Sequence, residues 1–306
     1  MGRYLVRKIL SLIFIVILVS LITFTALQVL PGDPALLILG TESSPEALAA
    51  IRSQLGLDKP ALVRFGQWLV SFVQGDLGQS IRYSVPVRVL VARALPITLT
   101  LALWAVFVSL GIAILLGVVS AAFASRWWGR GVRVFSQLGM AVPQFWIGIL
   151  FIQVFAVQLR VLPAGGFSGP RSLILPVATL ALPRTAVLLN MVQSGLANVL
   201  GSDYIRTAKA KGLPWAKVLF KHALINGAIA TATSAGIQLI QLLAGTIVVE
   251  QVFGLPGMGQ LVLTGVLQRD LPLVQAVVVL VAIGIVAVNF TVDLALMLLD
   301  PRIRFE

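Results

Sequence analysis

The sequence predicts an all-α, polytopic membrane protein with six transmembrane helices. Hydrophobic residues make up 58% of the 306-residue chain and charged residues only 11%, whereas soluble domains average about 45–50% and about 25%. Several stretches are also long and apolar enough to cross roughly 30 Å of hydrocarbon, which takes about 20 helical residues. These predicted spans lie near residues 9–30, 96–124, 135–159, 173–197, 223–248 and 273–299.

The composition also excludes several kinds of partner. A net charge of +12 could indicate nucleic acid, but the basic residues are interleaved with apolar runs rather than clustered with base-stacking aromatics. We therefore expect no nucleic-acid partner and membrane lipid instead. The chain has no cysteine and one histidine, so we expect no metal site and no cofactor bound by this chain.

The first span is too long for the core of a cleaved signal peptide, so we expect it to stay as an anchor. The connections fix the orientation, because Lys and Arg accumulate on the cytoplasmic side. With the N-terminus inside, the cytosolic segments hold most of the cations and few acids. These cations are Arg3, Arg7, Lys8, Arg126, Arg130, Arg133, Arg206, Lys209, Lys211, Lys217, Lys221, Arg302 and Arg304. Both termini are predicted to be cytosolic.

The outside connection, residues 31–95, contains start and stop signals typical of short helices. "SSPEALAAIRSQLG" has a cap at Ser43 or Ser44 and one apolar face, and "PALVRFGQWLVSFVQG" has an apolar stripe with Trp68 as an interfacial anchor. Both segments are predicted amphipathic helices. Packing on the membrane surface and docking of an external partner explain them equally well.

The longest inside connection, "GSDYIRTAKAKGLPWAKVLFKHALIN", is predicted to fold as helix, corner, helix. Ser202 or Asp203 can cap the first helix, and Gly212 can end it in the left-handed conformation. Pro214 suits the start of a second helix. Such a corner, with small residues and cations facing outward, is shaped for a groove on another protein. The alternative is that its charges only follow the positive-inside rule.

At this point the sequence resembles a known family. "RTAKAKG" resembles the EAA loop of binding-protein-dependent ABC importer permeases, in the variant of the dipeptide/oligopeptide/nickel (opine) branch. Further motifs similar to that branch follow one another along the chain: "LPGDPA" at 30–35, "LGLDKP" at 55–60, "GDLGQS" at 75–80, "LPITL" at 95–99, "PQFWIG" at 143–148, "VFGLPGMG" at 252–259 and "LDPRIR" at 299–304.

The resemblance implies a type I ABC importer permease fold in a bacterial inner membrane. Residues 1–93 would form the first span and external helices, 94–299 the membrane core, 198–222 the cytosolic coupling loop and 300–306 a cytosolic tail. The implied partners are a second homologous permease, two ATPase subunits that use ATP and Mg²⁺, and an extracytoplasmic substrate-binding protein. The residues implied to couple to the ATPase are Asp203, Tyr204, Arg206, Thr207, Ala208, Lys209, Lys211, Gly212 and Leu213.

Polar residues inside the spans are candidates for the pathway, because charge in hydrocarbon is costly. Where many relatives have arginines late in the fourth span, this chain has Asn190 and Gln193, and a charge appears earlier at Arg184. Arg184 is either a pathway residue near a peptide carboxylate or the partner of a group on a neighbouring subunit. Asp293 is expected to hydrogen-bond between helices. Pro143 predicts a helix break, which makes Gln144 a candidate for lining the path.

The turn after Glu250 combines glycines and a proline. Its candidate residues are Phe253, Gly254, Pro256 and Gly257. An external gate or re-entrant loop and a simple connector before an interfacial helix are both consistent with it.

We therefore expect a permease subunit that forms half of a translocation path for short peptides. No Gly-Lys pair occurs in the chain, so the phosphate-binding motif of an ATPase is missing and no catalytic residue is expected. Within the family, nickel-chelate, opine, haem or glutathione are alternative substrates. An ATP-independent channel or secondary transporter would carry repeat symmetry and several intramembrane carboxylates, and a membrane enzyme would need a paired nucleophile and base.

Overall fold

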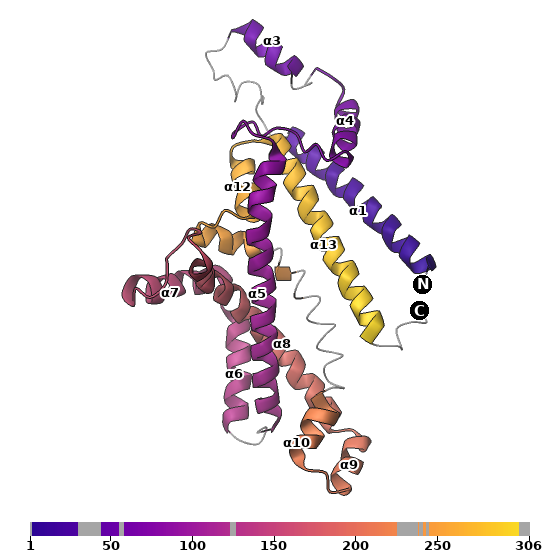
Figure 1. Ribbon diagram of the computed structural model, residues 1–306, viewed down its shortest axis with the longest axis vertical. Coiled ribbons are helices and arrows are strands. Elements are labelled where there is room, and N and C mark those ends of the chain that lie inside the picture. Colours follow the sequence, from indigo (N-terminus) through magenta and orange to yellow (C-terminus); the bar gives the residue numbers. More distant parts are fainter. Residues whose placement is uncertain are drawn as a thin grey trace. The chain divides into compact units, whose positions relative to one another are not determined.

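The structure is a computed structural model that describes residues 2–29, 44–54, 58–122, 127–224, 238, 241–242 and 245–299. Regular structure in these ranges is helical, apart from one isolated bridge between Gln79 and Pro86. The chain forms two compact units, Met1–Pro96 with Gly257–Val286 and Ile97–Pro256 with Ala287–Glu306 (Figure 1). The all-α prediction is confirmed, while the division of the chain after residue 93 stays a prediction.

Four long helices are apolar enough to cross a membrane. They are α1 (Gly2–Val29), α5 (Val87–Ala122), α8 (Ile174–Leu200) and α13 (Leu271–Leu299). Two pairs of shorter helices raise the number to six if each pair is one broken span: α6 (Trp127–Ala141) with α7 (Gln144–Phe151) and its π-helical continuation η1 (Ile152–Gln158), and the helix Gly245–Phe253 with α12 (Met258–Leu267). The predicted spans 9–30, 173–197 and 273–299 are confirmed, and that at 223–248 lies largely outside the described residues.

The second predicted span, 96–124, begins earlier than expected. Helix α5 starts at Val87 and passes through Pro96. Its first turns are ordered because Val87, Val91 and Ala94 recur on one face and are buried. In the first unit this face packs against Met258 of α12 and against α13 at Leu273, Ala276 and Val277. Burial of this apolar face therefore outweighs the helix-breaking signal of the proline.

The third predicted span, 135–159, is not continuous. Helix α6 ends at Ala141, Pro143 adopts an extended conformation with φ −62° and ψ 133°, and α7 begins at Gln144. The two halves are bent by 103°. The backbone N–H groups of Trp146 and Ile147 donate to the Pro143 carbonyl, which replaces the bonds lost at the break. The predicted break at Pro143 is confirmed.

The two predicted amphipathic helices of the first unit are present as α3 (Pro45–Gln54) and α4 (Ala61–Val73). Ser44 caps α3, because its Oγ accepts the Ala47 N–H at 3.2 Å. Helix α4 lies against α1 (Figure 1), where the Phe24 and Phe65 ring centroids are 5.4 Å apart and Arg64 lies 5.7 Å above the Phe24 ring. The rest of α1 presents mostly exposed apolar side chains, as a lipid-facing anchor does.

A buried carboxylate organises the first unit. Asp270 precedes α13 and is 0% exposed. Its carboxylate accepts the Ser80 hydroxyl and the backbone N–H groups of Arg82, at 3.1 Å, and Leu273, at 3.3 Å. The last bond is a helix cap. Asp270 thus ties the loop between α4 and α5 to the start of α13.

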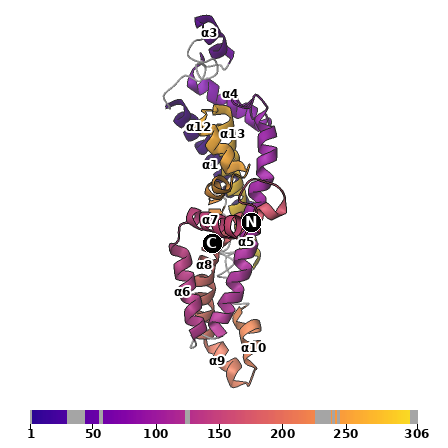
Figure 2. The ribbon, with the colours of Figure 1, turned by 90° about the vertical axis from the view of Figure 1, so that its left-hand side faces the viewer.

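The second unit is built around α8. Helices α6 and α8 pack side by side, and the part of α5 that belongs to this unit lies along them (Figure 2). One buried cluster joins α5 and α8 to Leu242 and to Val249 and Phe253 of the following helix. A second cluster joins α5 and α8 to the segment that follows α8. That segment is thereby part of the packed body.

Replacing Asp270 by Ala should destabilise the protein by about 1–3 kcal/mol, because the helix cap is lost and the buried donors are left without their acceptor. Thermal unfolding of the detergent-purified protein measures this as a lower Tm. Asp58→Ala, at an exposed aspartate, is the matched control and should leave Tm unchanged. Equal Tm values for the two variants would contradict the role assigned to Asp270.

Candidate functional site

The predicted corner is present at the end of α8. It consists of α9 (Asp203–Ala210), α10 (Trp215–Lys217) and the π-helical segment η3 (Val218–Leu224). Gly212 has φ +75°, the left-handed conformation that ends helices and that residues with a Cβ disfavour. Pro214 is extended and immediately precedes α10. The helix, corner, helix prediction is confirmed.

The caps of the corner differ in detail from the expectation. Ser202 occupies the N-cap position of α9 but its hydroxyl donates to the Val199 carbonyl at 2.6 Å instead of accepting from α9. Asp203 lies inside the first turn and faces Arg206 at 3.4 Å, an exposed pair that stabilises little. The corner closes with backbone bonds from Gly212 to Lys209 and from Leu213 to Ala208.

One face of the corner is packed into the protein. Ile205 is 0% and Ala208 8% exposed, and both contact buried residues of α5, α8 and η3. Leu213 packs against the same cluster. The expectation that the small residues face outward is therefore wrong for Ala208, whose methyl group fills the interior, and right for exposed Ala210. This packing fixes the corner to the body of the second unit.

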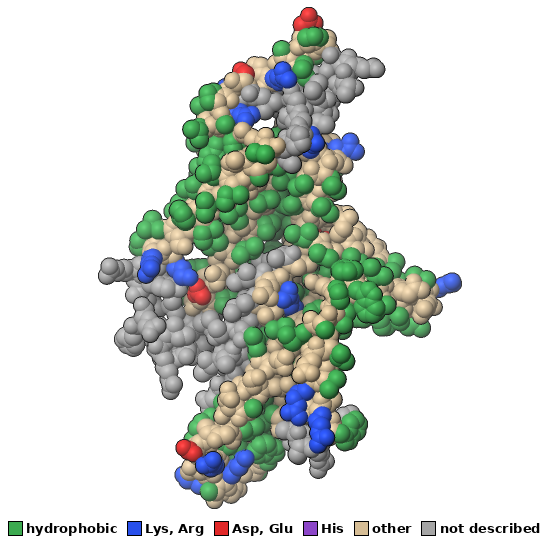
Figure 3. Space-filling view, turned by 180° about the vertical axis from the view of Figure 1, so that it is seen from behind, with side chains coloured by type: hydrophobic (Ala, Val, Ile, Leu, Met, Phe, Trp, Pro, Cys, Tyr) green, Lys and Arg blue, Asp and Glu red, His purple; other side chains and the backbone are tan. Residues whose placement is uncertain are grey.

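The opposite face of the corner is exposed and basic. Tyr204, Arg206, Thr207, Lys209 and Lys211 are all exposed. The Lys209 ammonium lies 4.8 Å above the Trp215 ring, a cation–π contact that holds the second helix against the first. Lys and Arg side chains gather at this end of the second unit in Figure 3. The arrangement offers a rigid basic ridge, which we name the basic corner (203–217).

The candidate gate residues lie in a well-anchored turn. Phe253 is 2% exposed and its side chain packs into a core cluster of the second unit. Its carbonyl accepts the Gly166 N–H at 2.7 Å, and a Cβ at Gly165 would lie only 2.6 Å from that oxygen. Gly254 ends the helix with φ +58°, and Pro256 is exposed whereas Gly257 is buried. A gating role for this turn stays a prediction.

The structure brings two of the polar candidates together. Arg184 donates through Nη1 to the side-chain oxygens of Gln238, at 3.2 Å, and Gln241, at 2.6 Å. Gln144, at the start of α7, and Arg184 both approach Gly245. Sequence reasoning missed the two glutamines, although amides inside the apolar run 223–248 were a visible signal.

The other polar candidates lie elsewhere. Asn190 accepts the Ser136 hydroxyl at 3.2 Å and contacts the Met140 sulfur at 3.3 Å, so it joins α8 to α6. Gln193 carries a buried side-chain nitrogen that has no hydrogen-bond partner in the part of the chain that the structure describes. Asp293 is half-buried on α13. A further buried carboxylate that was not predicted, Glu250, accepts the Thr98 hydroxyl at 2.6 Å.

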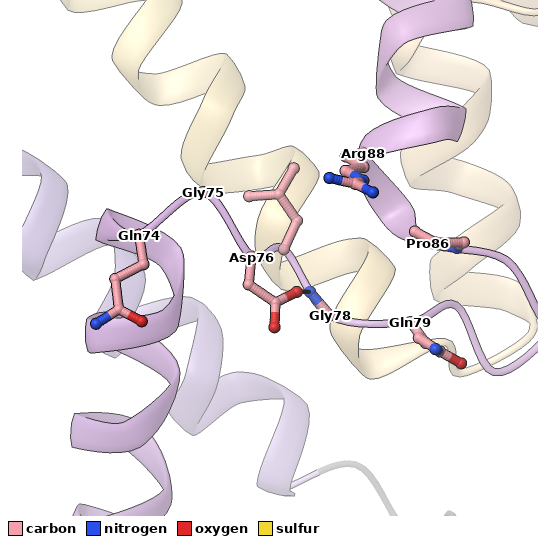
Figure 4. Close-up of a pocket in the computed structure, with 8 residues that line it drawn as sticks. Gln74, Gly75, Asp76, Gly78, Gln79, Pro86 and Arg88 are labelled. Carbon is pink, nitrogen blue, oxygen red and sulfur yellow. Dashed lines mark hydrogen bonds between the residues drawn. The ribbon is translucent and has the colours of Figure 1, made fainter.

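Residues 75–79 of the motif "GDLGQS" line a pocket of about 570 Å³ in the first unit, together with Gln74, Pro86 and Arg88. In Figure 4 the Asp76 carboxylate turns back to the Gly78 N–H, at 3.0 Å. Gly75 and Gly78 both have positive φ. The glycines therefore shape the loop that the Asp270 contacts hold.

The comparisons with known proteins agree with this geometry. The family described as "Binding-protein-dependent transport system inner membrane component" matches residues 113–305, and its N-terminal companion matches residues 1–102. The chain belongs to this family. It is a multi-pass permease subunit of an ABC importer in a bacterial inner membrane, and it is not itself an enzyme.

Similar proteins cover the whole chain. A putative peptide transport system permease protein of Brucella abortus is 38% identical over 314 residues, with 100% of both chains covered. A glutathione transport system permease protein of Salmonella choleraesuis is 37% identical over 310 residues, again with 100% of both covered.

A solved structure shows the same fold. An inward-facing structure of the MetNI methionine ABC transporter matches with a TM-score of 0.60 at 19% identity, over 69% of this chain and 96% of that one. At this identity the likeness concerns the fold alone. It confirms the expected importer permease architecture.

Replacing Ala208 by Leu should destabilise the permease by about 1–3 kcal/mol, because the added methylene groups overpack the interior. Ala210→Leu makes the same change at an exposed position of the same helix and should be close to neutral. Tm values in detergent measure both. If Ala208→Leu unfolds at the wild-type temperature, Ala208 is not packed as described.

Proposed function

We propose that this permease forms half of a passage for short peptides and is driven through the basic corner by a cytosolic ATPase. The observation that carries the proposal is the division of the corner into two faces. One face is anchored in the core through Ile205 and Ala208, and the other exposes Arg206, Lys209 and Lys211. A surface that is rigid, protruding and charged is suited to receive force from another protein.

The relatives support peptides as the transported class. Two of them, from Brucella abortus and Sinorhizobium fredii, carry peptide transport in their names, at 38% and 36% identity over 100% of this chain. Glutathione, named for the relative from Salmonella choleraesuis, is itself a tripeptide and is the second candidate. Short peptides share a backbone and two charged termini, so one passage can serve both.

The partners follow from what this chain lacks and what its family requires. A phosphate-binding Gly-Lys sequence is absent from the chain, so ATP and Mg²⁺ would be used by two separate ATPase subunits. A second, homologous permease would complete the passage. A binding protein on the outer side would deliver the peptide, in keeping with the family's description as binding-protein-dependent.

The corner would work as a lever. Its connection to α8 is short, because Ser202 and Gly201 bond back to the last turn of that helix. Movement of the ATPase against the corner would thus be passed to α8, which carries Arg184 and Asn190. Asp203, Tyr204, Thr207, Gly212 and Leu213 would complete or shape the docking face. Alternation between outward and inward access would follow from closing and opening of the ATPases.

Reversing the corner charges (Arg206→Glu, Lys209→Glu, Lys211→Glu) should release the ATPase and reduce ATP-driven peptide uptake at least about tenfold, because three attractive contacts become repulsive. Co-purification and uptake in proteoliposomes measure the two effects. The matched control reverses three exposed arginines outside the corner, Arg82, Arg160 and Arg171, and should retain the ATPase. Unchanged association after reversal of the corner would contradict the coupling role.

The proposed topology puts the corner in the cytosol and α3 outside. The chain contains no cysteine, so labelling of a single introduced cysteine shows on which side of the membrane that residue lies. In intact spheroplasts, Ser53→Cys should react with a membrane-impermeant maleimide, whereas Ala210→Cys should react only after the membrane is opened. Labelling of Ala210→Cys in sealed cells would place the corner on the wrong side for an ATPase.

A further inference from the structure

A cluster of polar side chains lies along α8 in the second unit, where Gln238 is buried, Arg184 and Gln144 are half-buried and Gln241 is exposed. Arg184 is half-buried near the middle of α8, where an arginine is costly unless it faces a protein interior or water. Its Nη1 donates to the Gln238 and Gln241 side-chain oxygens, at 3.2 and 2.6 Å, while Nη2 has one long contact among the described residues, to the Gln241 carbonyl at 3.5 Å. The Nη2 edge of the guanidinium therefore has room for a stronger hydrogen-bond acceptor.

Gln144 approaches the same place from another helix. It is the first residue of α7, and its side-chain nitrogen is buried and has no hydrogen-bond partner among the described residues. Gly245 marks the point where they converge: a Cβ built there would lie 3.4 Å from Gln144 Oε1, 3.8 Å from Gln144 Nε2 and 3.7 Å from Arg184 Nη2. Because residue 245 is glycine, no side chain from this position stands between the amide and the guanidinium.

The charges of this cluster do not balance. In the part of the chain that the structure describes, Arg184 hydrogen-bonds to amide oxygens and forms no ion pair with a carboxylate. Amide oxygens accept hydrogen bonds but do not neutralise a guanidinium, and a buried N–H without an acceptor carries a desolvation cost. The Arg184 guanidinium is positive and the Gln144 side-chain nitrogen is a donor near the same point. The two oxygens of a carboxylate would accept hydrogen bonds from both and neutralise the charge.

We propose that Arg184, Gln144 and Gln241 form a binding station for the C-terminal carboxylate of the transported peptide. This rests on the proposed function. Guanidinium and carboxylate match as two parallel hydrogen bonds. Peptides of different sequence have this carboxylate in common, so a station for it holds them without selecting their side chains. Gln238, 4% exposed, positions the guanidinium through Nη1.

The test compares two probes in the complete transporter, reconstituted with its partner permease, ATPases and binding protein. Labelled trialanine and its C-terminal amide differ only in the carboxylate, and the ratio of their ATP-driven uptake is measured. In Arg184→Gln the acid-to-amide ratio should fall about tenfold or more, as expected when a charged hydrogen-bond partner is lost. Arg184→Lys should fall between Arg184→Gln and wild type. The binding protein is the same throughout, so its own preference cancels.

Two further variants keep the test decisive. Gly245→Val fills the convergence point without removing the charge and should also lower the ratio; it decides the matter if Arg184→Gln fails to assemble. Arg171→Gln removes the same charge from an exposed position before α8 and should leave the ratio at its wild-type value.

The outcomes separate this inference from the function on which it rests. An unchanged ratio in Arg184→Gln and Gly245→Val, with peptide uptake intact in wild type, overturns the carboxylate station alone. Equal loss of both probes in an Arg184→Gln transporter that assembles normally also overturns it. If the wild-type transporter moves neither probe with ATP, the proposed function is wrong and this inference falls with it.

Discussion

The structure depends on one constraint: hydrocarbon offers no hydrogen-bond partners, so each polar group must be satisfied within the protein. The long apolar elements are helices for this reason, and their breaks are repaired locally. At Pro143 the backbone N–H groups in the first turn of α7 donate to the proline carbonyl. At the helix end near Phe253, the Phe253 carbonyl accepts the Gly166 N–H. Pro96 and Pro183 lie inside helices, which continue past them.

The same constraint accounts for the buried polar side chains. Asp270 satisfies a helix start and a loop with one carboxylate, and Glu250 receives the Thr98 hydroxyl. Each would be costly if left alone, and each instead fixes the relative position of segments far apart in sequence. Within each unit, hydrogen bonds at buried sites thus add the specificity that apolar packing between similar helices does not supply.

A subunit without nucleotide chemistry needs a stiff connection to its energy source. In the proposed function the basic corner would meet that need, since its inner face belongs to the same packed cluster as α5 and α8 and its outer face carries the cations. A flexible basic loop would satisfy the charge rule for cytosolic segments equally well. The packing of Ile205 and Ala208 against α5 and α8 is the observation that distinguishes a rigidly attached corner from a flexible loop.

The sequence by itself determined the helical class, most of the spans, the break at Pro143 and the corner at Gly212. These features follow from local causes: the length of apolar runs, the fixed φ of proline and the left-handed conformation that glycine allows. The tertiary structure alone decided that α5 begins at Val87, that Ala208 points inward and that Asp270 serves two segments. It also decided that Arg184 meets Gln144 at Gly245. Such pairings join residues remote in the chain, and no local pattern encodes which of many similar apolar faces will pack together.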